Sequence, residues 1–113
     1  MSNDAHRPHP LASPQPVREL IGYQEGSVVS RSLASAAGGN LTLFAFDQDQ
    51  GLSEHTTPHD AVVHALEGTV RVTVGEEEHE VGEGSLLLLP GGVPHALTAL
   101  TPFKMLLVML KQG

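Results

Sequence analysis

The length and charge of the chain bound what the protein can be. It has 113 residues, with 13 acidic and 6 basic side chains and a formal net charge of −7. One domain is therefore expected, and binding to nucleic acid, which needs clustered lysine and arginine, is not. The chain holds seven histidines and no cysteine. The lack of cysteine excludes a disulfide scaffold, a cysteine-based zinc site and a thiol nucleophile.

Residues 1–16 differ in composition from the rest of the chain. They contain four of the eight prolines and few apolar residues, and such a stretch cannot offset its own ordering entropy. We expect a flexible arm over 1–16, with His6 and His9 in solvent, followed by one domain over 17–113. The alternative is that part of the arm lies across a sheet edge or a partner subunit.

The sequence shows no pattern typical of a membrane span or of an apolar signal core. The longest apolar runs, 86–89 and 105–110, are far below the roughly 20 residues that a membrane helix needs. A cytoplasmic protein without a membrane partner is therefore expected.

Short apolar runs between turn residues predict β-structure. Several runs alternate with a period of two, as in Val70, Val72 and Val74, which share one face of a strand. Gly, Pro and Asn mark the turns between the runs. An all-β sandwich or barrel is predicted, with one turn of helix at most, within 16–23. The eight predicted strands lie at 27–34, 41–47, 61–66, 69–74, 77–81, 85–89, 95–100 and 103–110.

The spacing of glycine, proline and histidine in the second half of the chain is specific. Gly84, Pro90, Gly92 and His95 are separated by five, one and two residues. This spacing resembles the second motif of the cupin superfamily, G-x5-P-x-G-x2-H-x3-N, except that Ala99 stands at the asparagine position. The resemblance implies a small single-domain cupin of the RmlC-like type, with the all-β jelly-roll fold that is also called a double-stranded β-helix.

The first cupin motif, G-x5-H-x-H-x3,4-E-x6-G, matches less fully. Counting back from Gly68 puts Ala61 at the glutamate position, Thr57 at the second histidine and His55 at the first, while the leading glycine falls on Asp49. In the motif, three imidazoles and one carboxylate converge inside the barrel and bind a first-row divalent metal. The resemblance therefore leaves two of the four ligands in this chain.

A third metal ligand would have to come from another position. His59 is the nearest candidate, and Glu54 and Asp60 are others, although Asp60 needs a β-bulge because adjacent side chains in a strand point to opposite faces. The predicted metal site is His55, His59 and His95, holding Fe, Mn, Ni or Zn. The side chains expected to line the pocket beside it are Thr57, Ala61 and Val63.

Two functions remain open at this point. The first is a metal-dependent enzyme of the dioxygenase, isomerase or decarboxylase-like kind, in which the metal acts as Lewis acid or oxygen activator. The second is a metal-free module that binds or senses a small molecule, with His55 and His95 as polar anchors or as a general base.

Self-association is also expected. The resemblance implies a homodimer, and the run 105–110 is apolar on both faces, so it must be covered twice, inside the sandwich or, as we prefer, by a second subunit. Strand alternation puts His64 outside the pocket, at a subunit interface. His79 is expected in solvent, in a hairpin with the acidic residues 76–78.

Overall fold

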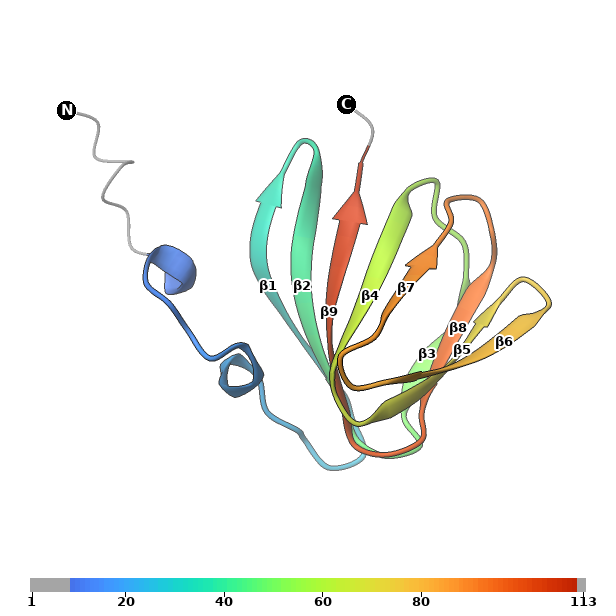
Figure 1. The fold of residues 1–113 in the computed structure, drawn as a ribbon, viewed down its shortest axis with the longest axis horizontal. Helices are drawn as coiled ribbons and strands as arrows, with labels where there is room; N and C mark the ends of the chain where they lie inside the picture. The colour runs from blue at the N-terminus through green and yellow to red at the C-terminus, as the bar shows by residue number, and fades with distance from the viewer. Residues whose placement is uncertain (1–8, 112–113) are drawn as a thin grey trace.

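Residues 9–111 are the part of the chain that the computed structural model describes. They form two antiparallel sheets, one of five strands in the order β1-β2-β9-β4-β7 and one of four strands in the order β3-β8-β5-β6 (Figure 1). No helix in this described part is long and apolar enough to cross a membrane. The strands are β1 Val28–Ala36, β2 Gly39–Phe46, β3 Gly51–His55, β4 Asp60–Glu67, β5 Thr69–Val74, β6 Glu77–Gly82, β7 Leu86–Leu89, β8 His95–Ala99 and β9 Phe103–Leu110.

The all-β prediction is confirmed, and each of the eight predicted runs contains a strand. The ninth strand, β3, was not predicted. Its sequence, GLSEH, has a single large apolar residue, Leu52, and so lacks the alternation that marks a strand. It forms because β8 offers its free edge as a pairing partner, which is a tertiary effect.

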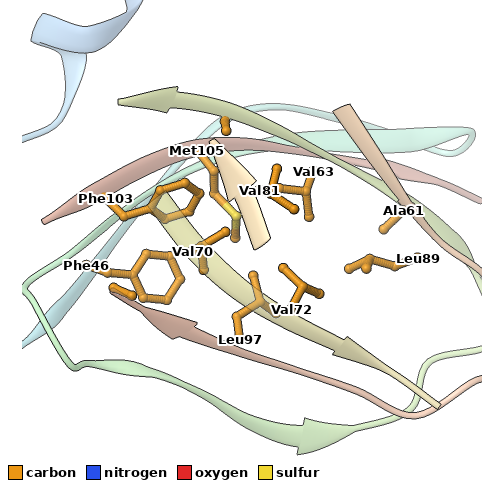
Figure 2. Packing of buried hydrophobic residues seen from close by; sticks show 12 residues of the cluster. Phe46, Ala61, Val63, Val70, Val72, Val81, Leu89, Leu97, Phe103 and Met105 are labelled. Carbon is orange, nitrogen blue, oxygen red and sulfur yellow. The ribbon is translucent and has the colours of Figure 1, made fainter. Parts of the chain in front are cut away.

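One core fills the space between the two sheets (Figure 2). Phe46 and Phe103 are fully buried and lie opposite each other on β2 and β9, with ring centroids 5.7 Å apart. The inward residues of β4 belong to the same core, and Ala61 and Val63 are 4% and 0% exposed. Two of the three residues predicted to line a pocket are thus core residues.

The segment 9–23, which we call the N-terminal segment, lies on the outer face of the five-stranded sheet. It contains two short 3-10 helices, η2 Pro10–Ala12 and η3 Val17–Leu20. Ile21 is buried and packs with Leu43 and Ala45, outward residues of β2. This burial explains why the segment is ordered here: it covers apolar surface that would otherwise face water.

Polar contacts fix the same segment. The Arg31 guanidinium on β1 donates to the Leu20 carbonyl over 2.7 Å. His9, expected in solvent, is exposed, but its Nε2 lies 2.7 Å from the Leu33 carbonyl. Residue 9, in the described part of the predicted arm, therefore contacts the sheet, in agreement with the alternative prediction that part of the arm lies across a sheet edge. His6 lies outside the described residues.

Lys104 joins the N-terminal segment to the outer face of the five-stranded sheet. It is buried on the outer face of β9, and its ammonium donates to the Arg18 carbonyl over 2.7 Å. The same Nζ lies 3.9 Å from the Glu67 carboxylate and 5.0 Å from the centre of the Tyr23 ring. The Tyr23 hydroxyl donates to Glu67. Partial burial, and then this hydrogen bond, raise the pKa of Tyr23.

We predict that Lys104→Met loosens the N-terminal segment while leaving the barrel folded. Methionine keeps the volume of the stem, but the Arg18 carbonyl and the Glu67 carboxylate lose their ammonium partner, at a cost of about 1–3 kcal/mol. Hydrogen exchange should then be faster at the amides of 17–21. Lys111→Met is the matched control. Equal exchange rates in Lys104→Met and Lys111→Met would show that Lys104 does not hold the N-terminal segment on the sheet.

Candidate functional site

His55 and His95 come from neighbouring strands of the four-stranded sheet. They stand directly opposite each other in the register of β3 and β8. Between the pair Leu52↔Leu97 and this histidine pair, β3 advances three residues and β8 only two. The extra residue is a β-bulge. In a regular strand, His55 would point away from the face that Leu52 occupies, so the bulge is what turns His55 toward His95.

The two imidazoles meet through their Nε2 atoms, which lie 3.1 Å apart. Each Nδ1 is held by a backbone carbonyl two residues earlier: His55 by Ser53 at 2.8 Å, and His95 by Val93 at 3.2 Å. A carbonyl can only accept, so each Nδ1 carries the proton, and a neutral ring then has a bare lone pair on Nε2. Two lone pairs facing each other at this distance require a proton or a cation between them.

The two histidines differ in their exposure to solvent. His95 is 6% exposed, whereas His55 lies open on the edge strand. Burial lowers the pKa of His95; the hydrogen bond to the Val93 carbonyl opposes this in part, and the nearby His55 lowers the pKa further. His95 is therefore neutral at pH 7, with its Nε2 available as a ligand.

The structure does not bring a third ligand to this pair. Within residues 9–111, no three His, Asp or Glu side chains lie close enough together to hold one metal ion. His59 stands apart in the loop before β4, where its carbonyl accepts from the Thr57 hydroxyl over 3.0 Å. Asp60 accepts from the backbone amide of Gly91 over 2.7 Å. Of the three histidines predicted to bind a metal, the structure brings together His55 and His95, the two at cupin-motif positions, and leaves His59 apart.

The interior beneath the histidines is filled. His95 shares the inner face of β8 with Leu97 and Ala99, which are 3% and 0% exposed. Leu97 lies beside Val72 in the core, and Leu89 belongs to the same cluster (Figure 2). A ligand of this site would therefore approach the imidazoles from solvent at the edge of the sheet, not from a cavity deep in the barrel.

The other described histidines lie elsewhere. His64 is on the outer face of β4, because Ala61, Val63 and Ala65 occupy the inner face. The position predicted for it outside the pocket is confirmed. His79 lies on β6, half-exposed, with its Nε2 3.2 Å from the Glu77 carboxylate.

Comparison with known proteins gives the family. The model of the cupin domain matches residues 42–109, more than half of the chain. Among solved structures, a conserved protein of unknown function from Streptococcus pyogenes superposes with a TM-score of 0.86 at 32% identity, over 90% of each chain. A cupin superfamily protein from Desulfitobacterium hafniense superposes with a TM-score of 0.86 at 27% identity, over 92% of this chain and 95% of its own.

A curated protein from Streptomyces coelicolor, described as uncharacterized, is 33% identical over 58 residues. That match spans 50% of this chain and 55% of the relative, about half the length of each. The family match covers both strands that carry the histidine pair, and the two solved relatives extend the likeness to nearly the whole sandwich. The chain is thus a member of the cupin family, with its jelly-roll β-fold.

Proposed function

We propose that this cupin binds a divalent transition-metal ion, of the Fe, Mn, Ni or Zn kind, through the Nε2 atoms of His55 and His95. The other coordination positions would be open to water or to a small organic ligand. The observation that carries the proposal is the convergence of two Nε2 lone pairs whose rings are each fixed through Nδ1. Metal-bound histidines commonly donate their second ring N–H to a carbonyl in this way.

The separation of the two nitrogens suits a shared ion. Two imidazoles that each bind an ion at about 2.1 Å are about 3.1 Å apart when the angle at the ion is near 95°, and the two Nε2 atoms are 3.1 Å apart. When bound, the ion would supply a Lewis acid. His95 would hold it from the buried side and His55 from the solvent side. With two protein ligands the affinity is expected to be modest, and tighter for Ni²⁺ or Zn²⁺ than for Mn²⁺.

We predict that untagged, metal-stripped protein takes up one Ni²⁺ or Zn²⁺ per chain in isothermal titration. His55→Ala and His95→Ala should each weaken metal binding at least ten- to a hundredfold, because mutating even a residue that only hydrogen-bonds to a metal ligand lowers metal affinity by that much. His79→Ala is the matched control, and the double variant His6→Ala/His9→Ala tests the contribution of the N-terminal histidines. Uptake by His55→Ala equal to that of the wild type would overturn the proposal.

A metal-free small-molecule binder is the alternative. It is supported by the same contact, because the two Nε2 atoms also satisfy hydrogen-bond geometry if one proton is shared between them. The pair would then anchor a polar ligand at the open edge of the sheet. This alternative predicts no heat on adding metal, and ¹⁵N chemical shifts of the two Nε2 atoms typical of a shared proton. Bound metal at both nitrogens would exclude it.

A further inference from the structure

A hollow lies between the N-terminal segment and the outer face of the five-stranded sheet. Its volume is about 580 Å³, which is within the range of small-molecule sites. It is separate from the histidine pair, which belongs to the four-stranded sheet. We call it the outer hollow, and its lining residues are Pro16, Val17, Arg18, Glu19, Glu67 and Lys104.

Lys104 brings a buried ammonium group to the outer hollow. The residue is 9% exposed, and its Nζ donates to the Arg18 carbonyl over 2.7 Å. The Glu67 carboxylate, at 3.9 Å, is beyond hydrogen-bond distance, and the face of the Tyr23 ring attracts the charge but supplies no lone pair. An ammonium has three N–H groups, so two of them lack an acceptor atom within residues 9–111. Because unsatisfied buried donors are costly, these two require acceptor atoms from whatever fills the outer hollow.

Glu67 adds an acceptor beside these donors. Its Oε2 accepts from the Tyr23 hydroxyl and is the oxygen that lies 3.9 Å from the Lys104 ammonium. Among the described residues, none donates a hydrogen bond to its Oε1, and the side chain is 35% exposed. The outer hollow thus presents free donors and a free acceptor, of opposite charge, on adjacent side chains.

The charges around the outer hollow limit what can enter it. Arg18 and Glu19 supply one more charge of each sign, so the formal charges of the lining cancel. The Arg18 guanidinium also bonds to the Glu83 carboxylate over 2.8 Å. A simple anion would be repelled by a chain of net charge −7, and a simple cation would leave the Lys104 donors unsatisfied. A neutral molecule that carries one charge of each sign avoids both costs.

We propose that the outer hollow binds a small zwitterion of the free α-amino-acid class. The ligand carboxylate accepts from the Lys104 ammonium, and the ligand ammonium donates to the Glu67 carboxylate. Both ligand groups are attached to one carbon atom, which suits two protein charges that are 3.9 Å apart. A short apolar side chain of the ligand packs against Pro16 and Val17, the apolar members of the lining. Hydrogen bonds between charged groups are about twice as strong as neutral ones, so both ligand charges contribute to affinity.

Titration of metal-stripped protein with L-valine and two analogues, followed by ¹H–¹⁵N NMR, tests the proposal. Isovalerate is valine without the ammonium group, and isobutylamine is valine without the carboxylate. Valine should bind with a dissociation constant of about 1 mM, and should shift the amide signals of 17–19 and Lys104 but not those of His55 and His95. Each analogue should bind at least about tenfold more weakly. No shift with up to about 10 mM valine, or an analogue that binds as tightly as valine, would overturn the proposal.

Glu67→Gln tests the role of the carboxylate. The amide keeps the volume and an oxygen that accepts from the Tyr23 hydroxyl, but it loses the charge that faces the ligand ammonium, so the dissociation constant for valine should rise at least about tenfold. Glu80→Gln, on the exposed face of β6 in the other sheet, is the matched control and should bind valine like the wild type. Valine affinity that is unchanged in Glu67→Gln would overturn the proposal. The comparison of the three ligands needs no variant, so it stands even where Glu67→Gln loosens the N-terminal segment. Metal uptake by the histidine pair is a separate measurement, and neither result decides the other.

Discussion

Phe103→Ala is expected to lower the free energy of unfolding by about 3–5 kcal/mol. The ring is fully buried, packs on Phe46 from the neighbouring strand, and lies in the core that joins the two sheets. Alanine would leave a cavity in this core, which strands fixed by hydrogen bonds to their neighbours cannot close. A small domain has only about 5–15 kcal/mol of stability, so the variant should be close to unfolding.

Urea denaturation followed by circular dichroism measures this change. Thr98→Ala, on the exposed face of β8, is the control and should change stability by less than about 0.5 kcal/mol. A loss under 1 kcal/mol in Phe103→Ala, which is roughly the cost of a single methylene group, would show that the ring is not packed as described.

Gly51→Ala is expected to weaken metal binding as much as His55→Ala does, without altering either histidine. A Cβ at this position would lie 2.0 Å from the Leu97 carbonyl oxygen of β8, a clash with backbone that a rotamer change cannot relieve. β3 must therefore move away from β8, and the His55–His95 contact depends on that pairing. Metal affinity should fall to that of His55→Ala, and stability should fall by about 1–3 kcal/mol.

Gly82→Ala provides a matched control in the same sheet. A Cβ there meets nothing within 4 Å, so metal titration and thermal melting should both match the wild type. If Gly51→Ala bound metal as tightly as Gly82→Ala, the site would not depend on the pairing of β3 with β8.

The motif spacing predicted the fold because it records local backbone requirements. The three motif glycines, Gly68, Gly84 and Gly92, all have positive φ, at 77°, 85° and 82°, a region that other residues seldom occupy. Asp49, at the place of the first motif's leading glycine, has a φ of 69°. Aspartate tolerates this region better than most residues, so the turn is kept although the glycine is not.

The details of the site could not be predicted because they depend on pairing between distant strands. Spacing alone placed His55 near His95, but the bulge that turns it inward follows from the register of β3 on β8. For the same reason His59, four residues away and the nearest candidate in sequence, does not join the pair. The carbonyls of Ser53 and Val93 that orient the rings have no side-chain signature.

The N-terminal segment shows the same limit at the level of the fold. Its first part, 9–16, belongs to the stretch 1–16 whose prolines and scarce apolar residues predict a flexible arm, yet the His9 Nε2 lies 2.7 Å from the Leu33 carbonyl of β1. The outcome depends on a strand that comes more than twenty residues later. The composition of a segment does not show whether a distant part of the chain offers a surface on which that segment can pack.

The place of β3 at the border of its sheet has a consequence for the dynamics of the protein. An edge strand is hydrogen-bonded along one side, and β3 is short and mostly exposed, so it belongs to the part of the barrel that opens most readily. An ion held by both imidazoles would fasten this strand to β8, and local opening would have to release the ion first. Occupancy and fraying are then linked equilibria: a bound ion makes β3 detach less often, and a β3 that detaches often binds the ion less tightly.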